Sequence, residues 1–233
     1  MLVHEGPSRS IRTDIRLGCT LAAVAGGVNV TGFLAFGAYA ANMTGNLSAV
    51  ATGLAPGGVM TVLCGLGLVA AFVAGAVVAT LRLMAGCRRG VACMHARIIV
   101  LEGVALMALG LVAGWLPAGP GAGVLGYGLS FLMGMQNATV THISGARVRT
   151  THMTGMLTDL GLELAQWMGN RTSPSPDVAT RLRLHGAIIA SFVLGGTAGA
   201  LGYAFLGTRS FMGLGAVLIV LALPAIVRGA ERA

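Results

Sequence analysis

The chain contains six apolar stretches, each long enough to cross a lipid bilayer as a helix. A spanning helix needs about 20 mostly apolar residues, because each residue adds about 1.5 Å against a hydrocarbon core of about 30 Å. With 55% hydrophobic and only 9% charged residues, the chain is not expected to be a soluble globule. We therefore expect an all-α integral membrane protein with six transmembrane helices. The stretches cover residues 17–40, 58–81, 98–116, 121–142, 186–206 and 210–227.

Arginine predicts the orientation of these helices, since the chain contains no lysine. If successive loops alternate between the two sides of the membrane, every arginine except Arg209 lies on the same side. Positive charge is retained on the cytosolic side during insertion, so both termini are expected in the cytosol. The net charge of +8 is then a topology signal. A nucleic-acid partner is not expected, because the arginines form no soluble basic face with interleaved aromatic residues.

The segments outside the apolar stretches predict two tails and a linker. Residues 1–16 are polar and hold no cleavage site, so they are interpreted as a cytosolic tail rather than a signal peptide. Residues 229–233 form the other cytosolic tail. Residues 170–184, which include two Ser-Pro pairs, are interpreted as a cytosolic linker.

A short signal occurs twice, as Ala-Asn-Met-Thr-Gly-Asn-Leu at 41–47 and Thr-His-Met-Thr-Gly-Met-Leu at 151–157. An amide precedes each copy, in Gly27-Val28-Asn29 and in Met135-Gln136-Asn137. A three-letter match alone arises by chance, but this shared register indicates duplication of one ancestral unit. Each unit then contributes three spans, so residues 17–116 and 121–228 enter the membrane from opposite sides, as an inverted repeat.

Each copy is followed by a short helical candidate, at 46–55 and at 156–168, with Thr44 and Thr154 as the expected N-caps. Residues 44–55 reach only about 18 Å as a helix, which favours a re-entrant half-helix over a full span. A helix that begins inside the membrane presents free N–H groups and a partial positive charge, which suit an anion or carboxylate. The alternative is that both threonines only cap helices at the membrane interface.

Polar residues in the apolar segments define the candidate substrate site, since an amide in hydrocarbon needs a partner or a wet cavity. Amides and hydroxyls also hold helices together. For Asn29 and Asn137 the two roles stay open, whereas for Thr139 and Thr141 the structural role is favoured. The candidate substrate-binding residues are Asn29, Asn42, Thr44, Gly45, Asn46, Gln136, Asn137, Thr154 and Gly155.

The acidic residues near the spans predict ion pairs at the cytosolic interface. Glu102, at the start of the third span, is expected to pair with an arginine rather than to carry a proton. Asp159 and Glu163 share one helix face and are expected to meet solvent or Arg147 and Arg149, with a charged gate as the alternative. The histidines at 142, 152 and 185 are expected at the interface.

No cofactor, metal ion or enzymatic activity is expected. Cys87, Cys93 and His95 match no common zinc spacing. Motifs of nucleotide-binding sites, metalloproteases and Ser/His catalysis are missing from the sequence. The expected partners are the lipid bilayer and a small-molecule or ion substrate. The small-residue pairs Gly110–Gly114 and Gly195–Gly199 serve packing within the chain or a homo-oligomer.

The pattern of Gly27-Val28-Asn29, Phe36-Gly37 and Asn42-Met43-Thr44-Gly45-Asn46 resembles the YoaK-like family of bacterial inner-membrane proteins of unknown function. Residues 133–138 and 151–155 are similar to the second signature of that family, so the resemblance spans both halves. It implies a multi-pass protein of the bacterial inner (plasma) membrane with distant kinship to major-facilitator-type transporters, and it supplies no substrate. An aspartate usually stands in the family where this chain has Asn29, which argues against a proton-coupling role there.

Together these features favour a small secondary transporter or permease for a small anionic or zwitterionic solute. An ion channel is the second interpretation, and it would require an unbroken polar path. A non-transporting membrane scaffold or accessory subunit is the third, and in that case the repeated signal would serve packing alone. The substrate and the coupling ion stay open.

Overall fold

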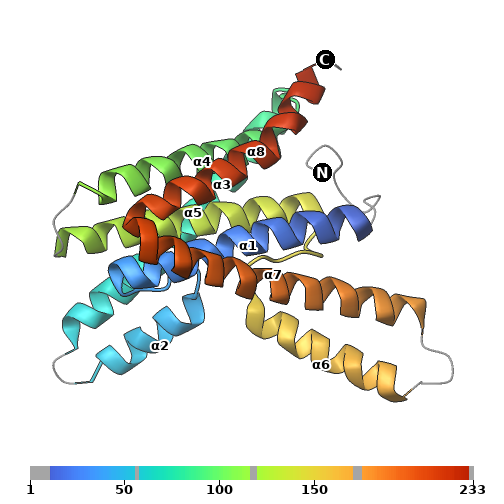
Figure 1. Ribbon diagram of the computed structural model, residues 1–233, viewed down its shortest axis with the longest axis horizontal. Coiled ribbons are helices and arrows are strands. Elements are labelled where there is room, and N and C mark those ends of the chain that lie inside the picture. The colour runs from blue at the N-terminus through green and yellow to red at the C-terminus, as the bar shows by residue number, and fades with distance from the viewer. Residues whose placement is uncertain (1–10, 56–57, 116–119, 170–174, 231–233) are drawn as a thin grey trace.

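The computed structural model describes residues 11–55, 58–115, 120–169 and 175–230, and all regular structure in these ranges is helical (Figure 1). Six long helices match the six apolar stretches, and two short helices begin inside the repeated signals. The helices are α1 (Ile11–Phe36), α2 (Met43–Gly53), α3 (Val59–Arg88), α4 (Met94–Ala113), α5 (Pro120–Ser144), α6 (Met153–Gly169), α7 (Pro176–Leu206) and α8 (Ser210–Ala230), with the 3-10 helix η1 (Gly207–Arg209) between the last two.

Four described segments are long and apolar enough to cross a membrane: Ile11–Phe36, Val59–Arg88, Met94–Ala113 and Pro176–Arg228, the last of which joins α7, η1 and α8. Large apolar side chains also face outward, as at Phe205, which is 84% exposed. Such a surface is unsuited to water and suits lipid. The chain is therefore an all-helical protein with the segments that a multi-pass membrane protein requires.

Two helices begin earlier than the apolar stretches that predicted them. α1 begins at Ile11, so residues 11–16 of the predicted tail are helical. α7 begins at Pro176, where the fixed φ of proline favours the first helical turn, so the predicted linker is helical over 176–184. α1 ends at Phe36, and Gly37 follows with a φ of +73°. The remaining parts of the predicted tails and linker, residues 1–10, 170–174 and 231–233, lie outside the described residues.

The two halves of the chain interlock, because each main helix pair takes one member from each half. α1 packs along α7, α3 along α5, and α4 along α8. The short helices pack on equivalent partners, α2 on α3 and α6 on α7. The colours of Figure 1 show that α1 and α5 run in opposite directions, as do α4 and α8. The packing of one half is therefore repeated by the other.

Glycines bring these helices into backbone contact. A Cβ atom at Gly26 of α1 would collide with the carbonyl oxygen of Phe192 on α7, and one at Gly134 of α5 would collide with that of Phe72 on α3. Gly199, in one of the predicted small-residue pairs, also faces α1, since its Cβ would lie 2.7 Å from the carbonyl oxygen of Gly27. The other pair contacts α8 through Gly110. Both patches thus serve contacts within the chain.

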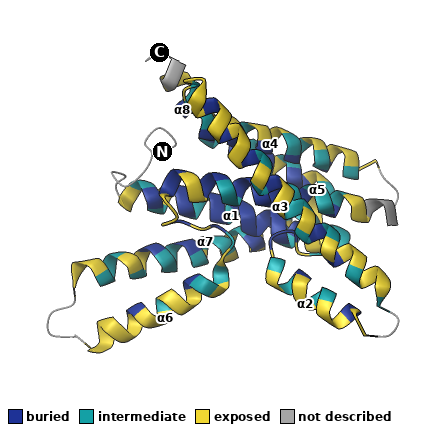
Figure 2. Ribbon diagram, turned by 180° about the vertical axis from the view of Figure 1, so that it is seen from behind, coloured by how far each residue is buried: buried dark blue, intermediate teal, exposed yellow. Residues whose placement is uncertain are grey.

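The core lies along α1, at the centre of the molecule. Leu17, Leu21 and Val28 of this helix are each at most 2% exposed. α2 and α6 lie at the edge of the molecule and bury few residues, as Figure 2 shows. The first turns of both short helices therefore lie near the core while their far ends are exposed.

Candidate functional site

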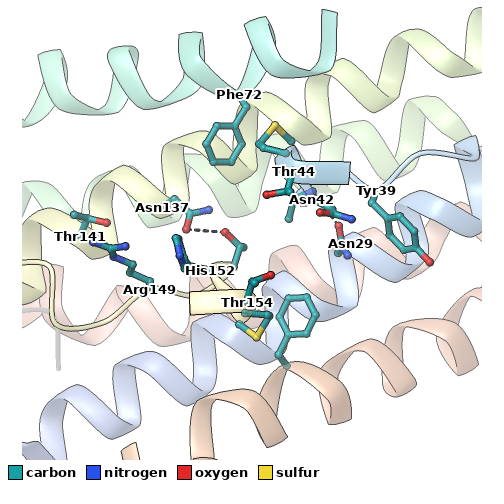
Figure 3. A pocket seen from close by; sticks show the side chains of 15 residues that line it. Asn29, Tyr39, Asn42, Thr44, Phe72, Asn137, Thr141, Arg149, His152 and Thr154 are labelled. Atoms are coloured by element: carbon teal, nitrogen blue, oxygen red, sulfur yellow. Dashed lines mark hydrogen bonds between the residues drawn. The ribbon is translucent and has the colours of Figure 1, made fainter. Parts of the chain in front are cut away.

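A cavity of about 600 Å³ lies where the N-terminal ends of α2 and α6 converge (Figure 3). Both halves of the chain contribute to its wall. The lining residues are Asn29, Tyr39, Ala41, Asn42, Met43, Thr44, Phe72, Asn137, Thr141, Arg149, Thr151, His152, Met153, Thr154 and Phe192.

The first residues of both short helices line the cavity. Met43 and Thr44 begin α2, and Met153 and Thr154 begin α6. The first turn of a helix holds N–H groups without partners inside the helix, and it carries a partial positive charge. Two such ends converging on one cavity favour a negatively charged group inside it.

The expected N-caps are wrong. The N-cap of α2 is Asn42, whose side-chain Oδ1 accepts a hydrogen bond from the Gly45 N–H at 3.1 Å. Thr44 and Thr154 instead lie inside the first helical turns. Both helices begin three residues earlier than predicted, and in α2 the Asn42 side chain, not that of Thr44, satisfies the free N–H group.

Gly45 and Gly155 make room for the side chain three residues earlier. A Cβ at Gly45 would collide with the Asn42 amide, and one at Gly155 would collide with the His152 ring. Asn42 and His152 occupy corresponding positions in the two repeated signals. Neither glycine lines the 600 Å³ cavity, so the glycines hold lining side chains in place rather than forming the wall.

Asn29 and Asn137 each line the cavity and tether the segment before a short helix. Asn29 Oδ1 accepts from the Ala41 N–H at 2.9 Å, and Asn137 Oδ1 accepts from Thr151 Oγ1 at 2.9 Å. Asn137 also donates to the Met133 carbonyl oxygen at 2.8 Å. The Asn29 amide nitrogen makes no hydrogen bond within the described residues and is available to a ligand. Of the two roles left open by the sequence, these hydrogen bonds support the structural one, while both side chains also line the cavity.

Arg149 and His152 give the cavity a basic side, which was not predicted as part of the site. Arg149 has no ion-pair partner among the described residues. Both residues also line a neighbouring pocket of about 420 Å³ that includes Arg147, Asp159 and His185. Arg149 and His152 therefore lie between the cavity and this neighbouring pocket. Their proximity to the repeated signal was the available clue, but the arginine was attributed to topology.

Two other predicted site residues lie outside the cavity. Asn46 is buried, and its amide donates to the Tyr39 carbonyl oxygen at 3.3 Å. Gln136 is fully buried in a separate hydrogen-bond chain with Glu102 and Thr150. Phe72 and Phe192 were missed because each lies in the middle of an apolar helix, where no local pattern distinguishes it from a lipid-facing residue.

Glu102 and Glu163 do not pair with the arginines that were predicted as their partners. Glu102 accepts from Gln136 at 3.0 Å and makes no ion pair within the described part of the chain. Glu163 is 5% exposed and contacts Arg181 at 3.5 Å and His185 at 3.1 Å on α7. The reason is tertiary, since α6 folds against α7 and removes Glu163 from the loop that holds the expected arginines.

The described residues contain no group of three or more His, Cys, Asp or Glu side chains that could hold a metal ion. The lining of the cavity is instead suited to binding a small solute through amides, hydroxyls and one guanidinium group.

A family model with the description "Protein of unknown function (DUF1275)" matches residues 17–224, which include both halves and every residue of the cavity wall. No curated protein and no solved structure matches the chain.

Proposed function

Since this chain belongs to the DUF1275 family of proteins of unknown function, we propose its function from the cavity: it is a small secondary transporter or permease for a small anionic or zwitterionic solute. The observation that carries this proposal is the meeting of both Met-Thr-Gly segments at one cavity. Residues about half the chain apart are brought to one site, and a purely structural role for each signal does not require this.

The proposed membrane architecture has six spans, arranged as two inverted three-helix units that each add a re-entrant short helix. The equivalent packing of the halves and the opposite directions of α1 and α5 support it. α5 is not one of the four segments whose length and apolar composition alone would allow them to cross a membrane. Its polar residues Gln136 and Thr139 are buried inside the protein, which suits a span shielded from lipid.

The chemistry of the lining supports an anionic or zwitterionic solute. The cavity volume of about 600 Å³ lies within the range of small-ligand sites, about 300–1,000 Å³. The helix ends and Arg149 would bind a carboxylate or another oxyanion, and a guanidinium can do so through two hydrogen bonds. The Asn29 and Asn137 amides and the Thr44 and Thr154 hydroxyl groups would bind the rest of the solute.

Inverted units supply a mechanism for alternating access, because the two halves can exchange conformations around a fixed central site. In such a cycle the site would open first along one short helix and then along the other. The backbone contacts join α1 to α7 and α3 to α5, so in such a cycle these mixed pairs, and not the halves, would move as packed bodies. A channel would instead hold both paths open at once.

The test begins with thermal unfolding of the purified full chain in detergent, with sulfate, phosphate, acetate, glutamate and glycine as probes. A ligand that binds only the folded state stabilises it by about 2.7 kcal/mol at a hundred times its Kd. We expect a concentration-dependent rise in Tm that is lost in the double variant Thr44→Val/Thr154→Val. The matched control is Thr61→Val/Thr197→Val, which changes two exposed helical threonines outside the cavity.

Probes that stabilise the protein are then followed as radiolabelled solutes into proteoliposomes. Saturable uptake and counterflow would support a carrier, whereas ion currents far above a carrier's turnover would favour a channel. No stabilisation and no uptake of any probe by the well-folded wild type would count against this solute class and favour a scaffold.

A further inference from the structure

Glu102 is a carboxyl group held in the interior, and none of the described residues forms an ion pair with it. Its side chain is 0% exposed, and its Oε1 accepts one hydrogen bond, from Gln136 Nε2 at 3.0 Å. The other oxygen, Oε2, has no hydrogen-bond partner among the described residues. An unpaired charge at such a position is costly, whereas a neutral carboxylic acid is far less so. The surroundings therefore suit Glu102 with a proton on it.

Within the described parts of the helices packed against α4, no buried cation lies beside this carboxyl group. On α4 itself Arg97 is exposed, while His95 is buried about two turns before Glu102. His95 Nε2 lies 3.1 Å from Nδ1 of His142, which is exposed on α5. The titratable residues on the other elements packed against α4 are all exposed, apart from the half-buried Tyr127. They are Tyr127 and His142 on α5, Arg228 on α8, Arg209 in η1, and Cys64, Arg82, Cys87 and Arg88 on α3.

Glu102 is linked to the cavity wall through the side chains of Gln136 and Thr150. Gln136 donates to Glu102, and its own Oε1 accepts from Thr150 Oγ1 at 3.3 Å. Thr150 is fully buried, and its neighbours Arg149 and Thr151 line the cavity. A shift of the segment 149–151 would therefore move the partner of Gln136, and with it the one hydrogen bond that the carboxyl group makes within the described residues.

We propose that Glu102 is the proton-binding side chain that couples solute movement to a proton gradient. It holds a proton in the conformation described here. When the segment 149–151 rearranges, the carboxylic acid releases that proton to water and becomes a carboxylate, and the reverse step restores it. This inference rests on the proposed transport function, and it corrects the expectation that Glu102 pairs with an arginine.

Infrared difference spectroscopy of the purified full chain tests the protonation directly and needs no solute. The carbonyl stretch of a protonated carboxyl group is separate from the bands of carboxylates and amides. We expect this band in the wild type at neutral pH and its loss in Glu102→Gln. The control Asp177→Asn changes an exposed acid and should keep the band. A wild type without the band, or with the same band in Glu102→Gln, would overturn the proposal.

Hydrogen–deuterium exchange of the peptide covering residues 145–153 tests the link to the cavity. After correction for the intrinsic effect of pH, protection of this loop should fall in the wild type as Glu102 loses its proton at alkaline pH. Glu102→Gln, which imitates the protonated acid, should keep the protection. The variant Gln136→Leu should weaken the pH dependence while the infrared band remains. An identical pH dependence in the wild type and Glu102→Gln would overturn the coupling.

The experiments can contradict the proposed transport function without contradicting the proton-binding role of Glu102. If the wild type transports none of the probes, the infrared and exchange results still decide whether Glu102 binds a proton and communicates with the loop. If sulfate or glutamate is transported, we expect accumulation against a gradient in the wild type to collapse with a protonophore. Glu102→Gln should retain counterflow of the same probe and lose the accumulation. Accumulation equal to that of the wild type would refute the coupling alone.

Discussion

Arg147 and Arg149 stand two positions apart and have different surroundings. An Arg147 guanidinium nitrogen lies 3.0 Å from Asp14 Oδ2, and this carboxylate is buried on α1. Arg149 has no ion-pair partner within the described residues and lines the cavity. The first arginine therefore neutralises a buried acid and joins the α5–α6 loop to α1. The second is the cation that a solute would meet.

Replacing Arg149 with glutamine is expected to weaken the binding of sulfate and glutamate. A hydrogen bond to a charged group contributes about 1.5–3 kcal/mol, which corresponds to roughly ten- to hundredfold in Kd. Ligand-induced shifts in Tm at increasing solute concentration would measure the change. Arg183→Gln, at an exposed arginine of α7, is the matched control and should bind as the wild type does. Equal affinity in Arg149→Gln and the wild type would show that the guanidinium does not contact the solute.

Gly45→Ala is expected to destabilise the protein by removing room for the Asn42 amide. Loss of an N-cap costs about 1 kcal/mol, and the added methyl group should displace the capping side chain. Gly161→Ala, in α6 with open space around its Cβ position, should instead gain about 0.5–1 kcal/mol from the lower entropy of alanine. Thermal unfolding of both variants would measure the difference, and a gain in Gly45→Ala would rule out the capping role.

Helix crossings at glycine are the main feature of element packing. The α1–α7 crossing at Gly26 and Phe192 has a counterpart in the α3–α5 crossing at Gly134 and Phe72. Both phenylalanines line the cavity, so each crossing holds part of its wall. Loosening a crossing should therefore affect both stability and solute binding.

Gly26→Ala and Gly134→Ala are each expected to destabilise the protein by about 1–3 kcal/mol, since a methyl group cannot fit against a backbone carbonyl without moving a helix. Similar losses for the two variants would reflect the equivalence of the crossings. Gly213→Ala, on α8 with no atom near its Cβ position, is the control and should lose nothing. The measurement is the unfolding transition in detergent. Full stability of Gly26→Ala would mean that α1 and α7 are further apart than described.

The short helices show how far local sequence predicts an element. The Met-Thr-Gly signals located both helices and their approximate ends, because a polar break in an apolar chain is a strong local feature. The starting residue was wrong, since capping depends on which nearby side chain reaches the free N–H groups. That selection is made by the loop geometry of residues 37–42, which the sequence pattern does not encode.

For the whole molecule, the proposed topology assigns the two ends of the bundle to opposite sides of the membrane. The start of α1 and the end of α8 lie toward the same end of the molecule in Figure 1. Arg88 ends α3 next to Cys87, and Arg89 follows in the loop to α4, so this end of α3 is expected in the cytosol. η1 is expected on the opposite side.

Cysteine labelling tests this topology in cells that express the full chain. In a background with the other cysteines replaced, Cys87 should react with a membrane-impermeant maleimide only after the cytosolic side is opened. Thr208→Cys, in η1, should react in intact cells. Both positions are outside the buried core, so access to reagent depends on the membrane rather than on protein burial. Labelling of both cysteines from the same side would contradict an odd number of spans between them.

The sequence by itself determined the six long helices, the two short ones and the duplicated signal, because hydrophobic length and polar breaks are local properties of the chain. It also identified Asn29, Asn42, Thr44, Asn137 and Thr154, which the tertiary structure does bring to one cavity. Membership of a family of unknown function agrees with the resemblance seen in those same motifs.

Only the tertiary structure decided which polar groups meet. Glu102 faces Gln136 instead of an arginine, Glu163 pairs with α7, and Arg149 turns to the cavity while Arg147 binds Asp14. The three hydrogen bonds and ion pairs join side chains of different elements, so their geometry depends on how those elements pack. Local patterns predict which residues must find a partner, because burial makes an unpaired polar group costly. The identity of the partner depends on how the helices pack.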